Sequence, residues 1–325
     1  MLNFVVDFIL TVLIKLINIL TCPITYLIKI SNKKSQSNNK IKRIRFLDFQ
    51  KGFDKDNNFF TNLLKRYNHN FEVVDKNQDI IIFSVWGINQ FYPDLIRNIL
   101  YPNTKYIYYT AEYESFNKKK LIRNIDLNLT FQHTTKFNNI RLPYWIFNLN
   151  IDNKDKNIKM CLTKKNTDKF CCFVFSNSVP HRNNFCKRLS EYRKIDCGGR
   201  CLNNIGGRVD NKLEFQRKYK FCIAYENSIS DGYTTEKILE AFLSNCIPIY
   251  LGSPSVNNDF NSETFINAAD FDSEDELINY IIKVDNDDQL YNSYMNKPIF
   301  SERWIEILSD PNETYFKNIA KRIME

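Results

Sequence analysis

The sequence predicts an α/β protein built from two Rossmann-like lobes, with a membrane-associated helix in front of them. Short runs of β-branched and aromatic residues alternate with helical patterns from residue 43 onward, which is typical of βαβ units with parallel sheets. The chain has 325 residues, enough for two hydrophobic cores. An apolar segment over residues 2–30 supplies the predicted helix.

The first lobe is predicted to span residues 43–150. Its strands are expected at 44–49, 80–86, 105–109 and 127–131, with a helix at 92–100. These runs are rich in β-branched and aromatic residues, which favour strands.

The second lobe is predicted to span residues 160–305. The apparent seam between the two lobes is a polar stretch at 150–169 that is dense in Asn, Asp and Lys. Its strands are expected at 170–176, 219–225, 247–252 and 264–268, and its helices at 235–243 and 275–283. Residues 306–325 are predicted to form a C-terminal helix, centred on 312–324, that could cross back to the first lobe. Ligands of open parallel sheets bind at the carboxyl ends of the strands.

The N-terminal segment is predicted to associate with a membrane. Its polar residues recur every three or four positions and therefore share one face of a helix: Asn3, Asp7, Thr11, Lys15, Asn18, Cys22, Thr25 and Lys29. Such a helix can span the bilayer once or lie in its interface, and the alternative is a helix docked on the protein's own body. The basic linker, residues 31–42, begins a run that would attract anionic lipids.

The net charge of +8 does not indicate a nucleic-acid-binding protein. Eight basic residues and one acidic residue, Asp7, lie within positions 1–45, so this segment carries +7 and the remainder only +1. A nearly neutral body has no need of a basic face, so no nucleic-acid partner is expected.

The cysteines and acidic clusters do not predict a metal site. Four of the nine cysteines fall in apolar runs and are interpreted as buried free thiols: Cys171, Cys172, Cys222 and Cys246. Cys197 and Cys201 have no histidine nearby. Asp285 and Asp287 have the Asp-x-Asp look of metal-dependent transferases, but they lie in an acidic stretch after a helix and are interpreted as solvated surface. No cofactor or metal is predicted.

The segment 219–271 is the most informative about function. A strand ends at Glu226 and Asn227, a polar loop with Gly232 follows, and Thr234 or Thr235 begins a helix. The loop and the first helical turn thus lie at the carboxyl edge of the sheet, where free N–H groups favour a phosphate.

Three side chains at this helix start suit a nucleotide. Lys237 adds a cation for a diphosphate, Glu236 can accept hydrogen bonds from sugar hydroxyls, and Tyr233 can stack or hydrogen-bond. The alternative is that Glu236 and Lys237 are ordinary solvated residues of a first helical turn.

This segment resembles the signature of the α-1,3/4-fucosyltransferases, glycosyltransferase family 10, in the form seen in bacterial members. The resemblance covers more than fifty residues in order. The matching motifs are Tyr219-Lys220-Phe221, Tyr225-Glu226-Asn227, Tyr233-Thr234-Thr235-Glu236-Lys237, Pro248 to Gly252 with Ser253-Pro254-Ser255-Val256, Asp259-Phe260-Asn261, and Phe265-Ile266-Asn267 through Asp270-Phe271.

Two further motifs extend the resemblance. Ser176-Asn177 followed by His181-Arg182-Asn183 is similar to the family element whose arginine contacts the donor diphosphate, which implies that role for Arg182. The run from Tyr108 to Glu112 is similar to the strand that ends in Gly-Glu-Asn and bears the family's proposed catalytic base. Here Ala111 replaces the glycine and Tyr113 the asparagine, and Glu114 competes with Glu112 for the role.

The resemblance implies a GT-B fold with two facing lobes, the first binding the acceptor and the second GDP-fucose. It implies a metal-independent, inverting transfer of L-fucose to a hydroxyl of an acceptor glycan or glycoprotein, with α-1,3 linkage expected. Glu112 would be the base, while Arg182, Asn227, Tyr233, Glu236 and Lys237 would bind the donor. The family's animal members imply a Golgi-type membrane, although the basic run also suits a cytoplasm-facing body.

Two rival functions fit the same sequence. One is a GT-B transferase that uses another sugar nucleotide, and the other is a catalytically inactive, membrane-bound glycan-binding protein. Ala111 and Tyr113, which depart from the family motif on either side of Glu112, favour the inactive glycan-binding protein.

Overall fold

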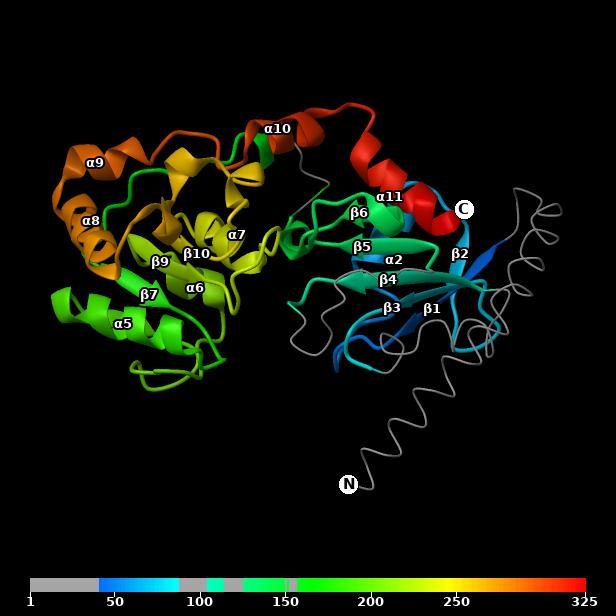
Figure 1. Cartoon of the computed structure of the whole chain (residues 1–325), viewed down its shortest axis with the longest axis horizontal. Helices are drawn as coiled ribbons and strands as arrows, with labels where there is room; N and C mark the ends of the chain where they lie inside the picture. The colour runs from blue at the N-terminus through cyan, green and yellow to red at the C-terminus, as the bar shows by residue number, and fades with distance from the viewer. Residues whose placement is uncertain (1–40, 88–103, 114–124, 150, 152–156) are drawn as a thin grey trace, which may run out of the picture. The chain divides into compact units, whose positions relative to one another are not determined.

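The computed structural model describes residues 41–87, 104–113, 125–149, 151 and 157–325. The chain divides into two compact units, one of Met1–Leu142 with Tyr315–Glu325 and one of Pro143–Thr314 (Figure 1). The predicted membrane helix at 1–30, most of the basic linker and the predicted helix at 92–100 lie outside the described residues. None of the helices that are described is long and apolar enough to cross a membrane.

The described part of the first unit contains a parallel sheet of six strands in the order β2-β1-β3-β4-β5-β6. Its strands are β1 (Lys42–Leu47), β2 (Phe71–Val73), β3 (Ile80–Phe83), β4 (Lys105–Thr110), β5 (Leu127–Thr130) and β6 (Asn139–Arg141). Every residue of β3 is buried, as expected for a central parallel strand covered on both faces.

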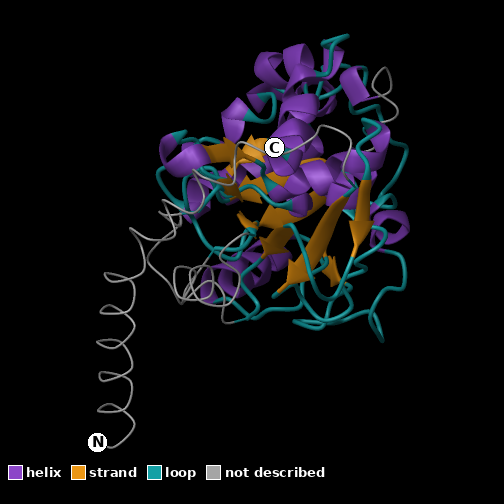
Figure 2. Cartoon of the chain, turned by 90° about the vertical axis from the view of Figure 1, so that its right-hand side faces the viewer, coloured by secondary structure: helices purple, strands orange, loops and turns teal. Residues whose placement is uncertain are grey.

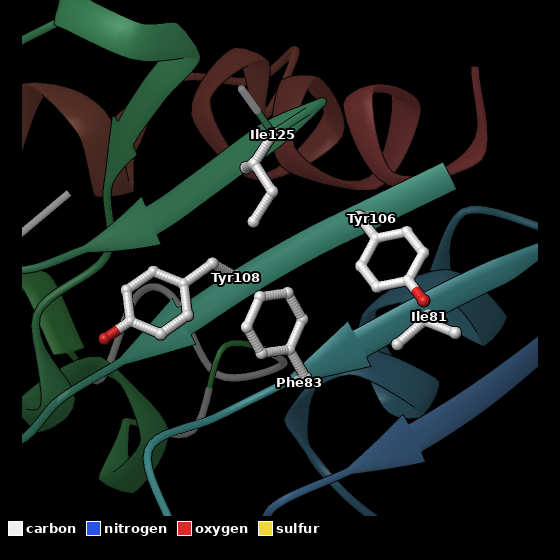
Figure 3. Close-up of a cluster of buried hydrophobic side chains, with 5 residues drawn as sticks. All are labelled: Ile81, Phe83, Tyr106, Tyr108 and Ile125. Atoms are coloured by element: carbon white, nitrogen blue, oxygen red, sulfur yellow. The ribbon is translucent and has the colours of Figure 1, made fainter. Parts of the chain in front are cut away.

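Neighbouring strands of this sheet share one apolar cluster. Ile81 and Phe83 on β3 pair in register with Tyr106 and Tyr108 on β4, and Ile125 lies just before β5 (Figure 3). Alternate residues of a strand point to the same face, so both members of each strand reach this cluster.

Two described helices cover the first sheet. The helix α2 (Phe59–Arg66) is capped by Asn58, whose side chain accepts hydrogen bonds from the amides of Phe60 and Thr61. The helix α11 (Thr314–Met324) is bound by side-chain hydrogen bonds at both ends. The Tyr315 hydroxyl donates to the Arg141 carbonyl, and the Lys105 ammonium donates to the Arg322 carbonyl.

The second unit is described almost completely and contains a five-stranded parallel sheet in the order β11-β10-β9-β7-β8. Its strands are β7 (Cys171–Phe173), β8 (Ile195–Cys197), β9 (Phe221–Tyr225), β10 (Ile247–Leu251) and β11 (Ile266–Asn267). Its helices are α5 (Pro180–Tyr192), α6 (Lys212–Gln216), α7 (Glu236–Leu243), α8 (Glu274–Asn286), α9 (Asp288–Ser293) and α10 (Glu302–Ser309). Figure 2 shows the α/β character of the described structure, with its helices and strands in separate colours.

The division between the units falls at residue 142, earlier than the predicted seam at 150–169. The reason is Trp145 in the short 3-10 helix η4 (Tyr144–Asn148), which is fully buried against the second unit's aromatic residues. Its ring centroid lies 5.2 Å from that of Phe260, 5.5 Å from that of Phe300 and 4.6 Å from that of Trp304.

The structure confirms a strand at each predicted position and helices at 235–243, 275–283 and 312–324. The sequence did not reveal β2, β6 and β8, which are three-residue strands at sheet edges and too short for an apolar period. It also missed α5, whose buried face includes a charged residue, Arg182.

The interpretation of Asp285 as solvated surface is wrong. Its side chain is 1% exposed and accepts hydrogen bonds from Lys220 at 2.7 Å, Arg193 at 2.8 Å and Tyr192 at 3.0 Å. Burial raises the pKa of Asp285, but the hydrogen bonds and charges of Lys220 and Arg193 outweigh burial and leave the pKa below its ordinary value. Asp285 therefore ties α8 to the residues flanking β9 and α5.

We expect Asp285→Asn to lower the free energy of unfolding by about 2–4 kcal/mol near neutral pH, because it leaves Lys220 half-buried without its counter-charge. Since the folded pKa of Asp285 is depressed, this contribution is present above the ordinary pKa of an aspartate and is lost as pH falls through the folded value. Urea unfolding of both proteins between pH 3 and 7 checks this. A difference that stays constant across this range would contradict the ion-pair account.

Candidate active site

Three segments of the second unit meet at the carboxyl ends of its central strands. Glu226 and Asn227 directly follow β9, Gly252 directly follows β10, and the loop from Asn227 to Thr235 leads into α7. The loop turns at Gly232, whose φ of +76° is a left-handed conformation that glycine adopts without strain. Because β9 and β10 are parallel neighbours, their carboxyl ends lie side by side.

Glu226 is the most enclosed polar residue of this region, with no exposed surface. Its carboxylate accepts the Thr235 amide at 2.7 Å, the Thr235 hydroxyl at 2.7 Å and the Lys237 ammonium at 2.9 Å. An ionised carboxylate is tolerated in such a place only when charged and polar donors surround it.

Lys237 and Glu236 complete this arrangement at the first turn of α7. The Lys237 ammonium also donates to the Thr235 hydroxyl at 2.7 Å and lies 3.5 Å from a Glu236 carboxylate oxygen. Burial lowers the pKa of Lys237, but the charges of Glu226 and Glu236 outweigh it, so the pKa is raised and the ammonium stays charged. Burial raises the pKa of Glu236, but Lys237 and Lys212 outweigh it and the pKa is lowered.

Arg182, on the first turns of α5, brings a second cation to the same place. Its guanidinium donates to the Asn227 side chain and lies over the rings of Phe173 and Phe175, 5.2 and 4.9 Å from their centroids. Arg182 is 2% exposed, and its Nε atom has no hydrogen-bond partner within the described residues. It interacts electrostatically with Glu226, and burial lowers its pKa.

Two further residues of this loop, Gly232 and Tyr233, are buried. The Gly232 amide donates to the Ser253 hydroxyl at 2.9 Å and to the Ser255 hydroxyl at 3.1 Å. Tyr233 is 2% exposed, so its ring packs inside the unit. The Gly232 turn therefore fastens the loop to the segment after β10.

The helix start differs from the sequence-based expectation in one respect. The Thr235 amide, which was expected to face a phosphate, is already bonded to Glu226, and the Thr235 side chain makes no capping bond to the helix. A carboxylate of the protein itself thus complements the positive end of the α7 dipole. The side chains of Arg182 and Lys237 bring two positive charges that can meet an anion here.

Glu112 lies in the first unit, two residues beyond β4. Its side chain is exposed, and its backbone amide is fixed by the Thr110 hydroxyl at 3.1 Å. Glu114, the competing candidate, lies outside the described residues. A carboxylate at the carboxyl end of a central parallel strand has the position expected for a catalytic group of an open α/β sheet.

The structure therefore brings Arg182, Asn227, Glu236 and Lys237 together in the second unit, with Tyr233 buried beneath them. The sequence-based set left out Glu226, whose carboxylate binds the Lys237 ammonium directly and interacts electrostatically with Arg182. The sequence contains one feature that points to Glu226: a carboxylate directly after an otherwise apolar strand, which lies at the carboxyl edge of the sheet.

No metal or thiol chemistry is evident in the described residues. They contain no group of three or more His, Cys, Asp or Glu side chains that could hold a metal ion. The eight cysteines within them are free thiols, which confirms the interpretation of Cys171, Cys172, Cys222 and Cys246 as buried and unpaired.

Comparison with solved structures shows a GT-B fold of the glycosyltransferase type. A crystal structure of an alpha1,3-fucosyltransferase with GDP-fucose matches with a TM-score of 0.66 and 23% identity, covering 89% of this chain and 93% of that one. A second crystal structure of an alpha1,3-fucosyltransferase matches with a TM-score of 0.66 and 24% identity, covering 88% and 93%.

Two family profiles then identify the chain. Residues 163–301 match the profile "Glycosyltransferase family 10 (fucosyltransferase) C-term", and residues 44–148 match "Alpha-(1,3)-fucosyltransferase FucT N-terminal domain". Together these ranges cover more than half of the chain. The protein belongs to glycosyltransferase family 10.

Curated relatives agree with this assignment. The chain is 34% identical to the alpha-(1,3)-fucosyltransferase FucT of Helicobacter pylori over 216 residues, 57% of this chain and 45% of that relative. It is 35% identical to the 4-galactosyl-N-acetylglucosaminide 3-alpha-L-fucosyltransferase 9 of Mus musculus over 135 residues, 40% and 37% of the two chains. The matches thus span less than half the length of these relatives.

We expect Gly252→Ala to disturb the site through packing alone. A Cβ atom at this position would lie 2.5 Å from Glu226 Cγ and also too close to the Tyr250 hydroxyl. The substitution should lower the free energy of unfolding by about 1–3 kcal/mol, which chemical denaturation measures. Gly207→Ala is the control, because Gly207 has open space around its Cβ position, and equal stabilities of the two variants would contradict the packing account.

Proposed function

We propose that the protein transfers L-fucose from GDP-fucose to a hydroxyl of an acceptor glycan, with inversion at the anomeric carbon. The observation that carries the proposal is the meeting of two cations, Arg182 and Lys237, beside β9 at the carboxyl edge of the second sheet. The fucosyltransferase relatives support the choice of donor.

The donor side of the reaction needs positive charge at the leaving group. As the bond between fucose and the diphosphate breaks, negative charge grows on the departing GDP. Arg182 offers a buried guanidinium whose Nε proton has no hydrogen-bond partner among the described residues, and Lys237 offers an ammonium that stays charged. Fixed cations of this kind stabilise a transition state because they need no reorganisation during the reaction.

The acceptor side needs a base. We assign this role to Glu112, which would take the proton of the attacking hydroxyl as the new bond to the anomeric carbon forms. Its exposed carboxylate follows β4 in the unit that matches the N-terminal fucosyltransferase profile. Glu236 would accept hydrogen bonds from hydroxyls of the donor, and Asn227 and Tyr233 would complete the donor site. The scheme uses no metal ion.

Several finer points belong to the same proposal. We expect an α-1,3 linkage, a glycan or glycoprotein acceptor, and anchoring through residues 2–30 and the basic run at a Golgi-type membrane or with a cytoplasm-facing body. The acceptor-binding lobe is placed at 43–150 and the donor-binding lobe at 160–305.

The direct test uses the full chain in detergent or vesicles. Labelled GDP-fucose, GDP-mannose and UDP-sugars are each offered with a panel of acceptor glycans, and bound and transferred label are counted. Transfer from GDP-fucose alone supports the proposal. Transfer from another donor would replace it with the first rival function, and glycan binding without transfer would replace it with the second.

We expect Lys237→Ala to weaken GDP binding by about ten- to hundredfold, because a charged hydrogen bond to the diphosphate is lost. Calorimetric titration of the folded variant measures this. Lys164→Ala removes an exposed lysine of the same unit, 62% exposed and 3.8 Å from Asp288, and should bind GDP like the wild type. Equal affinity of the Lys237 variant and the control would remove Lys237 from the diphosphate site.

We expect Glu112→Gln to leave GDP affinity unchanged and to lower kcat by about a hundredfold or more, because the amide cannot accept the acceptor's proton. Single-turnover transfer with saturating GDP-fucose measures the chemical step. Undiminished transfer by this variant would show that another group, with Glu114 the first to test, is the base.

A further inference from the structure

We propose that Glu226 is a positioning residue of the donor site, whose carboxylate holds the Lys237 ammonium and the start of α7 in the arrangement that meets the nucleotide diphosphate. This inference rests on the proposed function of the site. Glu226 has no exposed surface, so it cannot itself contact the donor and must act through its neighbours.

The contacts around Glu226 form a closed set of three groups. One carboxylate oxygen accepts the Thr235 amide at 2.7 Å, and the other accepts the Lys237 ammonium at 2.9 Å. The Thr235 hydroxyl lies within 2.9 Å of both oxygens and accepts a hydrogen bond from Lys237 at 2.7 Å. Each group thus limits the movement of the other two.

The backbone of Glu226 is fixed as tightly as its side chain. Its amide donates to the Leu251 carbonyl at 2.7 Å, which ties the end of β9 to β10. Its carbonyl lies 3.3 Å from the His181 ring nitrogen, and Gly252 packs where any Cβ would meet Glu226 Cγ. The carboxylate therefore has one position, set by the ends of two strands and by α5.

The charge of Glu226 matters because two cations stand near it. The positive charges of Arg182 and Lys237 repel one another, while the negative charge of Glu226 attracts both. A lysine has a long, flexible side chain, and holding it in one rotamer costs conformational entropy. Glu226 orders the Lys237 side chain in the folded protein, so this entropy is lost during folding and not during donor binding. The two cations are then preorganised to bind two phosphoryl groups.

Lys237 keeps one side available for a ligand. Its side chain is 16% exposed, whereas that of Glu226 is fully covered, so part of the lysine side chain reaches solvent while its ammonium contacts the buried carboxylate. Glu226 therefore orients the Lys237 ammonium from the buried side, and a diphosphate can approach Lys237 from the solvent side.

The test compares Glu226→Gln with Glu226→Asp in the full chain. The Gln variant keeps the volume but loses the charge and turns an amide donor toward Lys237 or Thr235. The Asp variant keeps the charge but shortens the side chain. We expect GDP affinity to fall by about ten- to hundredfold in the Gln variant and by less in the Asp variant, with KM for GDP-fucose rising in step. A purely space-filling role predicts the opposite order.

A double-mutant cycle asks whether Glu226 acts through Lys237. In a Lys237→Ala background, Glu226→Gln should weaken GDP binding by less than threefold, because the cation that Glu226 positions is gone. If Glu226→Gln does not fold, the same cycle with Glu226→Asp carries the test. A full, additive loss in the Lys237→Ala background, or wild-type affinity in both Glu226 variants, overturns the proposal.

Asp285→Asn is the matched control. Asp285 is a buried carboxylate of the same unit, paired with Lys220 at the opposite end of β9, and it shares no contact with the donor residues. Its variant should lose stability yet bind GDP like the wild type. A wild-type chain that binds neither GDP nor GDP-fucose would instead refute the proposed function, and this inference with it.

Discussion

The proposed donor site depends on one interaction, the burial of the Glu226 carboxylate against the Thr235 amide and the Lys237 ammonium. An ionised group without solvent contact is stable only if its donors are fixed, and here the donors lie on the first turn of α7. This interaction therefore constrains the end of β9, the loop that follows it and the start of α7 relative to one another. Asn227, the next residue, extends that constraint to Arg182 on α5.

Parallel topology is what makes this constraint possible. The strands β7, β9 and β10 all point the same way, so the segments that follow them lie at one edge of the sheet. Apolar residues fill the strands themselves and leave that edge to the polar side chains. At the opposite end of β9, Lys220 and Asp285 form a second buried ion pair that joins the sheet to α8. The Lys220–Asp285 ion pair and the proposed donor site thus lie at different ends of the same strand.

The candidate site could be predicted from sequence only in part. Lys237 and Glu236 were found because a helix start after a buried strand is visible in the residue pattern, and Arg182 only through family resemblance. Glu226 was missed as a functional residue because sequence shows that a strand ends there but not which donors its carboxylate meets. Asp285 was misread for a related reason: its neighbours Asp287 and Asp288 make the stretch look solvated, whereas its partners, Arg193 and Lys220, are distant in the chain.

The sequence by itself determined the α/β class, the main strands, and the strand-to-helix segment proposed to bind the donor, because hydrophobic periodicity and strand-to-helix turns are local properties. Only the tertiary structure decided the short edge strands, the inclusion of Trp145 in the second unit, the return of the C-terminal helix to the first, and the contacts of Glu226. Each of these rests on contacts between residues far apart in the chain. Such contacts form only when the sheets bring their ends together.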